Sequence, residues 1–83
     1  MDKETKRINN TELAKAILDK VYLALEERGY DPLGQIANFL MTGEPTFITN
    51  HKKARSLIMK VDRETLLEVL LTNYFCDKKE ESE

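Results

Sequence analysis

The stretch that decides the fold runs from Gly29 to Arg55 and reads GYDPLGQIANFLMTGEPTFITNHKKAR. It contains all three glycines, both prolines and the only histidine of the 83-residue chain. Glycine commonly ends helices in a left-handed conformation, and proline favours their first turn, so these residues mark helix boundaries. The stretch therefore predicts a turn-rich middle between two flanking helical segments.

A short helix is predicted from Pro32 to Thr42 within this stretch. Asp31 is a favourable N-cap, and Pro32 suits the first helical position. Gly43 is placed to close the helix, and Pro45 prevents it from continuing. These four residues bound one helix without help from the rest of the chain.

The next segment, Thr46–Thr49, is β-branched and aromatic and too short to build a sheet. It is predicted to be an extended connector that places Phe47 or Ile48 in the core. Thr49 or the following asparagine then caps a third helix, predicted over residues 51–60. The middle of the chain thus holds two short helices and one connector.

Outward toward the N-terminus, apolar residues recur at three- and four-residue steps and predict a helix that ends at about Arg28. Asn9, Asn10 and Thr11 are all favourable N-caps for it, and Gly29 stands where its left-handed C-terminal residue is expected. Residues 1–9 are polar and are predicted to be a mobile tail. The apolar stripe comprises Ala14, Ile17, Leu18, Val21 and Leu25.

Toward the C-terminus, Asp62 is a favourable N-cap for a last helix that is predicted to end at about Cys76. Its apolar residues cover about two-thirds of the helical circumference, whereas packing on one side needs a stripe of only about 100°. The helix is therefore predicted to be central, or to pack on both its own domain and a second chain. The candidate dimer face comprises Leu66, Leu67, Leu70, Leu71 and Tyr74.

The whole chain is predicted to be one all-α domain of about four helices over residues 10–76, between disordered charged termini at 1–9 and 77–83. Its single cysteine excludes an intramolecular disulfide, so helix packing or a partner subunit must stabilise the domain. The N-terminus lacks the apolar run of a signal peptide, and no window is apolar enough to span a membrane. These features predict a cytoplasmic protein.

Residues suited to catalysis are sparse in this sequence. Cys76 stands at the end of a predicted helix, where the dipole disfavours a thiolate. His51 has no second histidine with which to form a metal site. The sequence therefore predicts a protein that is not an enzyme and that needs neither a metal nor another cofactor.

A basic segment follows the connector and contains Lys52, Lys53, Arg55 and Lys60 without an acid between them. It is typical of a solvated helix face, but it also suits an acidic or phosphorylated partner, for which Lys52, Lys53 and Arg55 are the candidate site. A third interpretation is a small helix-turn-helix that binds nucleic acid. The net charge of −2 argues against nucleic acid.

The central stretch resembles the IreB family of small regulatory phosphoproteins from Gram-positive bacteria. That family shares a glycine-tyrosine-x-proline turn and a later glycine-x-proline turn. It also shares a histidine that is followed, after two intervening residues, by alanine-arginine. The spacing agrees without a gap from about Ala14 to Tyr74. The matching residues are Gly29, Tyr30, Pro32, Gln35, Ile36, Gly43, Pro45, Ile48, His51, Ala54 and Arg55.

The resemblance implies a function that composition and periodicity do not. It implies a regulator controlled by a Ser/Thr protein kinase, negative in sign, in cell-envelope stress signalling and cephalosporin resistance. It also implies phosphorylation in the N-terminal region, where Thr5 and Thr11 are the candidates. A homodimer is implied as well, and the downstream protein partner is left unnamed. Tyr30, Gln35, His51 and Arg55 are expected to form a polar network or a partner surface.

Overall fold

The computed structural model describes the backbone of residues 2–82 and the side chains of residues 11–76. It contains no strand within that part of the chain. This confirms the all-α prediction for the described residues. The elements are the helices α1 (Asp2–Glu27), α2 (Pro32–Thr42), α3 (Ala54–Ile58) and α4 (Arg63–Ser82), with the 3-10 turns η1 (Pro45–Phe47) and η2 (His51–Lys53).

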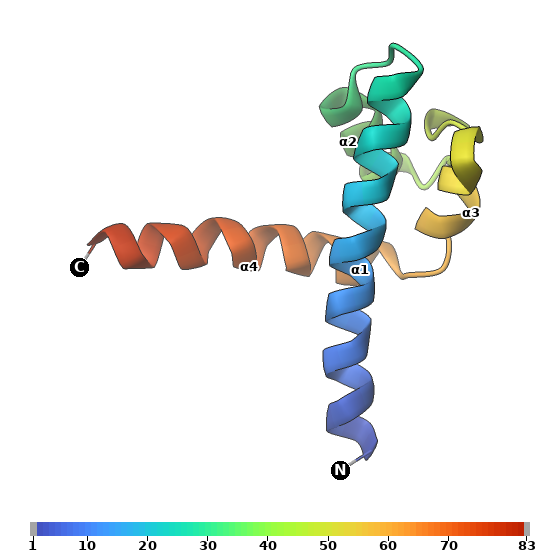
Figure 1. The fold of residues 1–83 in the computed structure, drawn as a ribbon. Coiled ribbons are helices and arrows are strands. Elements are labelled where there is room, and N and C mark those ends of the chain that lie inside the picture. Colours follow the sequence, from blue (N-terminus) through green and yellow to red (C-terminus); the bar gives the residue numbers. More distant parts are fainter. Residues whose placement is uncertain (1, 83) are drawn as a thin grey trace.

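Helix α1 is the central element, because α2, α3 and α4 all pack against it (Figure 1). α2 and α3 lie beside its C-terminal half, whereas α4 crosses it and projects away from the other helices. The predicted stripe of α1 forms the middle of the core. The buried core residues are Ala14, Ile17, Leu18, Val21, Ala24, Leu25, Ile36, Phe39, Ile48, Ala54, Ile58, Leu66 and Val69.

The end of α1 has the hydrogen bonds of a Schellman motif. The Gly29 N–H donates to the Glu26 carbonyl at 3.0 Å, and the Tyr30 N–H donates to the Leu25 carbonyl at 3.0 Å. Gly29 has a φ of +83°, a conformation that costs other L-residues about 1–2 kcal/mol. The predicted role of Gly29 as the residue that stops α1 is confirmed.

Helix α2 begins and ends at the predicted residues and is joined to α4 at its C-terminus. Gly43 has a φ of +77°, and its N–H donates to the Phe39 carbonyl at 2.7 Å. The guanidinium of Arg63 lies against Gly43, and its Nη1 donates to the Leu40 carbonyl at 3.0 Å. The first residue of α4 therefore satisfies a free carbonyl in the last turn of α2.

The outer ends of the two long helices differ from the prediction. α1 already begins at Asp2, because asparagine and threonine are only moderately unfavourable inside a helix and did not stop it. α4 continues past Cys76 to Ser82, through a segment without glycine or proline. The tails predicted at 1–9 and 77–83 lie outside the residues whose side chains are described, and their mobility stays a prediction.

The middle segment also differs from the prediction in its backbone. The connector is a 3-10 turn rather than extended, although Ile48 after it is extended and fully buried, as predicted. The third helix ends at Ile58 and is preceded by η2, where Lys52 and Lys53 have φ values of +53° and +62°. Two lysines in this conformation interrupt the continuous helix that was predicted.

Candidate functional site

Two of the family-motif residues attach the connector to the helices. Gln35 Nε2 on α2 donates to the Phe47 carbonyl at 2.8 Å, and Arg55 Nε on α3 donates to the Ile48 carbonyl at 3.0 Å. Both hydrogen bonds are partly buried. Phe47 is the last residue of η1 and Ile48 follows it, so neither carbonyl is paired within a longer helix or a strand. These contacts hold Ile48 in the core, because a buried carbonyl without a partner is costly.

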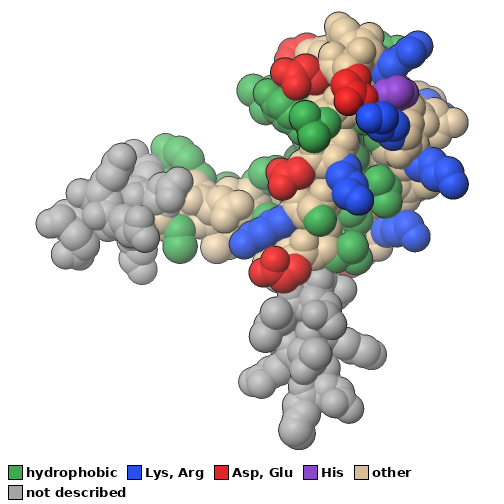
Figure 2. All heavy atoms as spheres, viewed as in Figure 1, with side chains coloured by type: hydrophobic (Ala, Val, Ile, Leu, Met, Phe, Trp, Pro, Cys, Tyr) green, Lys and Arg blue, Asp and Glu red, His purple; other side chains and the backbone are tan. Residues whose placement is uncertain are grey.

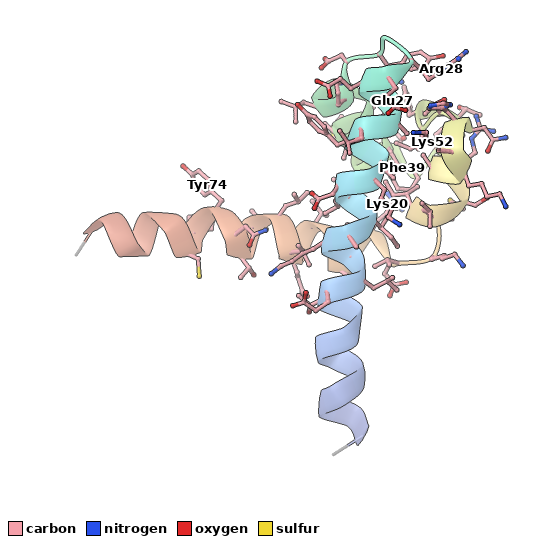
Figure 3. All side chains as sticks on the ribbon, viewed as in Figure 1. Lys20, Glu27, Arg28, Phe39, Lys52 and Tyr74 are labelled. Atoms are coloured by element: carbon pink, nitrogen blue, oxygen red, sulfur yellow. The ribbon has the colours of Figure 1, made fainter. Side chains whose placement is uncertain are left out.

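His51 and Lys52 converge on one carboxylate at the end of α1. His51 Nε2 lies 2.8 Å from Glu27 Oε1, and Lys52 Nζ lies 3.2 Å from Oε1 and 3.3 Å from Oε2. The hydrogen bond from His51, followed by that from Lys52, lowers the pKa of the Glu27 carboxyl below its ordinary value. The cluster fastens η2 to α1, and Figure 3 shows Glu27 and Lys52 side by side.

The sequence carries one signal for this cluster, which is the acid at the end of α1. Glu27 is the last residue of α1, where the partial negative charge of the helix disfavours a carboxylate. An acid at that position therefore indicates a cation nearby. The only described cations that contact it come from η2, through His51 when protonated and through Lys52.

A groove runs along α1 beside this cluster, and we call it the α1–α3 groove. It has a volume of about 340 Å³ and lies between the C-terminal half of α1 and the segment that contains η2 and α3. Figure 2 shows basic side chains distributed over this face, with the histidine between an acidic and a basic side chain. The lining residues are Lys20, Leu23, Ala24, Glu27, Lys52 and Leu57.

The predicted acidic-partner site is divided by the structure. Lys52 lines the α1–α3 groove, whereas Arg55 uses its Nε to bind the Ile48 carbonyl. Lys53 is exposed and does not line the α1–α3 groove. The cation that joins Lys52 at the groove is Lys20 of α1, which no local pattern indicated.

The residues of the candidate dimer face lie in two different environments on α4. Leu66 is fully buried against α1 and is not available to a partner, which corrects its place in the candidate dimer face. Leu67, Leu70, Leu71 and Tyr74 are 40–56% exposed, and Phe75 adds to them at 56%. Tyr74 points away from the rest of the molecule in Figure 3.

The buried and exposed apolar faces of α4 adjoin each other. Leu66 and Val69 face the core, whereas the exposed set is centred about 140° further around the helix, with Leu70 at the boundary between the two faces. The rings of Tyr74 and Phe75 pack edge to face with centroids 5.0 Å apart.

A pocket of about 290 Å³ lies between α1, α2 and α4, and its lining is almost entirely apolar. Its lining residues include Leu18, Tyr22, Leu33 and Leu70.

The remaining candidates lie elsewhere in the fold. Thr11 lies within α1 rather than in a cap, near Lys15 and Glu68 at the junction with α4. The side chain of Thr5 lies outside the described residues. Tyr30 is half exposed, and Gln35, His51 and Arg55 make separate contacts rather than one network.

The described part of the chain holds no candidate metal centre and no membrane-spanning helix. Cys76 is exposed, and among the described residues no three His, Cys, Asp or Glu side chains are grouped so that they could hold a metal ion. The described helices include none with the length and apolarity that spanning a membrane requires. A helix-turn-helix is not favoured, because residues 43–53 separate α2 from α3 and α3 has only five residues.

Comparison with known proteins identifies the family of this chain. The chain matches the family model described as IreB regulatory phosphoprotein over residues 2–76. It is also 49% identical over 80 residues to a UPF0297 protein of Lachnoclostridium phytofermentans, covering 84% of this chain and 90% of that protein. The matched range contains the positions of Gln35, Arg55 and the Glu27 cluster. The chain therefore belongs to the IreB family of regulatory phosphoproteins.

Proposed function

We propose that this protein is a non-enzymatic cytoplasmic regulator whose partner binding is controlled by a Ser/Thr protein kinase. The observation that carries the proposal is the match to a family of regulatory phosphoproteins over nearly the whole chain. The pathway we propose is cell-envelope stress signalling, with a negative role in cephalosporin resistance.

The phosphate acceptors we propose are Thr5 and Thr11. A phosphate adds a charge of about −1.5 to −2, enough to change a contact with a neighbouring charge. At Thr11 it would stand near Glu68 of α4 as well as Lys15 of α1, so it would act on the junction between these helices. Phosphorylation there is expected to weaken the contact between α1 and α4.

The test is phosphorylation of the full chain by the catalytic domain of a cognate Ser/Thr kinase, followed by mass spectrometry. We expect label within residues 1–11, and loss of that label when Thr5 and Thr11 are both replaced by alanine. Replacement of Thr72, an exposed threonine of α4, is the matched control and should leave the label unchanged. Label confined to residues beyond 11, or no label at all, would refute the proposed phosphate acceptors.

We further propose that the regulator acts as a homodimer that packs through the exposed face of α4. Five neighbouring apolar side chains of α4 are each 40–56% exposed. Exposed apolar side chains that are grouped in this way mark interaction surfaces more often than single ones do. The partner we propose for this face is a second copy of the chain, which is present wherever the protein itself is present. Burying this face would also supply core that a short chain lacks.

Analytical ultracentrifugation tests the dimer. We expect about twice the chain mass of 9.6 kDa for the natural chain and the single-chain mass for Leu70→Asp. Cys76→Asp places the same charge on an exposed position of α4 on the side opposite the exposed apolar face, and it should remain dimeric. A natural chain that sediments as a monomer at several hundred micromolar would end this proposal.

A further inference from the structure

The α1–α3 groove combines an apolar floor with a lysine toward each end. Leu23 is 54% exposed, Ala24 is buried, and Leu57 is half-buried at the opposite wall. Lys20 and Lys52 are both exposed and line the same groove (Figure 3). We propose that this groove binds a short acidic segment of a partner protein, with one apolar side chain between two carboxylates.

The apolar part of the proposal follows from the size and lining of the groove. A volume of about 340 Å³ is at the lower limit for small-molecule sites, and it is large enough for one or two apolar side chains. An exposed leucine beside a buried alanine provides a shallow hollow rather than a flat surface. A leucine or isoleucine from a partner would cover Leu23 and complete its burial.

The acidic part of the proposal follows from the positions of the two lysines. Lys20 precedes Glu27 by seven residues, which is about 10 Å along a helix, and Lys52 is bound to Glu27. In an extended peptide, side chains on one face recur every two residues, or about 6.6 Å. In the order acid-x-apolar-x-acid the two acids are therefore about 13 Å apart. Two long, flexible lysine side chains whose positions along α1 differ by about 10 Å can reach both of them.

Lys52 can bind a second carboxylate without leaving Glu27 unpaired. Glu27 has two hydrogen-bonding partners, and His51 is the closer at 2.8 Å. If Lys52 turns toward a ligand, His51 continues to hold Glu27 and η2 remains fastened to α1. Because His51 also binds Glu27, Lys52 is available to a ligand, unlike a lysine that is the sole partner of an acid in a surface ion pair.

The backbone at Lys52 gives independent support. Lys52 and Lys53 both have positive φ values, an arrangement that costs energy for residues other than glycine and that often occurs where a ligand is held. With this left-handed backbone, Lys52 lies beside Glu27 at the end of α1. A glycine would adopt the same backbone more easily, but it would not supply the cation.

A titration of the ¹⁵N-labelled, unphosphorylated full chain with a synthetic peptide tests the inference. The peptide is an acetylated and amidated pentapeptide with aspartate at both ends, leucine at the centre and alanine between them. We expect saturable shifts of the amide signals of Lys20, Leu23, Lys52 and Leu57, with an affinity that falls as salt is raised. A peptide with alanine at the centre should bind at least about fivefold more weakly.

Variants of the chain separate this groove from other basic surfaces. Lys20→Glu and Lys52→Glu should each weaken binding by about fivefold or more, whereas Lys15→Glu, on α1 but outside the groove, should leave it unchanged. Circular dichroism confirms that each variant is folded. Absence of saturable shifts, equal binding of the alanine-centred peptide, or shifts confined to α4 would overturn the inference.

This inference concerns the partner-binding part of the proposed function and does not rest on phosphorylation. Because the titration uses the unphosphorylated chain, its failure would leave the kinase assay unaffected. Failure of the kinase assay would likewise leave the proposed peptide binding in the α1–α3 groove unaffected. The two results are therefore distinguishable.

Discussion

Replacing Gly43 by alanine should destabilise the fold by two separable effects. The residue has a φ of +77°, so an L-side chain costs about 1–2 kcal/mol there. A Cβ at this position would also lie 2.9 Å from Cζ of Arg63 and would displace the guanidinium. Arg63 would then lose its 3.0 Å hydrogen bond to the Leu40 carbonyl, which is worth about 1 kcal/mol.

Gly29 provides a matched control, because it shares the first effect and lacks the second. Its φ is +83°, and nothing lies within 4 Å of the position that a Cβ would occupy. Gly29→Ala should therefore cost about 1–2 kcal/mol, and Gly43→Ala about 1 kcal/mol more. In an Arg63→Met background the two glycine variants should become equal, because the displaced hydrogen bond is already absent.

Urea unfolding followed by circular dichroism measures these free energies. All variants must be compared at one protein concentration, because dimerisation would make stability depend on concentration. The double-mutant cycle of Gly43 and Arg63 gives the coupling directly. If Gly29→Ala costs as much as Gly43→Ala in the natural background, the hydrogen bond of Arg63 does not stabilise the end of α2.

Three further predictions concern the connector, the Glu27 cluster and α2. Arg55→Met should lower the unfolding free energy by about 1–3 kcal/mol in urea titrations, because it leaves the partly buried Ile48 carbonyl unpaired. The pKa of Glu27 is lowered from 4.5 by hydrogen bonds from η2, so the resulting stability is present above pH 4.5 and lost as the pH falls through the lowered value. The difference in urea midpoint between the natural chain and Glu27→Gln should therefore narrow in acid. Gly34→Ala should raise the thermal midpoint by a few degrees, because helix propensity gains up to about 1 kcal/mol and the interfering atom, 2.5 Å away, belongs to the rotatable carboxylate of Asp31.

Helix boundaries were predictable from sequence wherever a residue can adopt a conformation that others avoid. Gly29, Pro32 and Gly43 stand where the structure ends α1 and begins and ends α2. Asn9, Asn10 and Thr11 are equally good caps, yet α1 passes through them, because a residue that favours an end does not forbid a helix. The left-handed lysines of η2 had no such signal, since lysine is ordinarily a helix former.

The side chains of the candidate site were less predictable than the boundaries, because their partners lie far apart in the sequence. Gln35 and Arg55 were expected in a polar network, but the carbonyls they bind became known only from the path of the connector. Lys20 and Lys52 are 32 positions apart and share a groove only because η2 turns back over the end of α1. The motif thus specifies the turn, and the turn brings together the charges that give the groove its chemistry. A relative that keeps the motif but lacks one of these lysines would retain the fold and lose the proposed acidic ligand, which makes the groove a property separable from the fold.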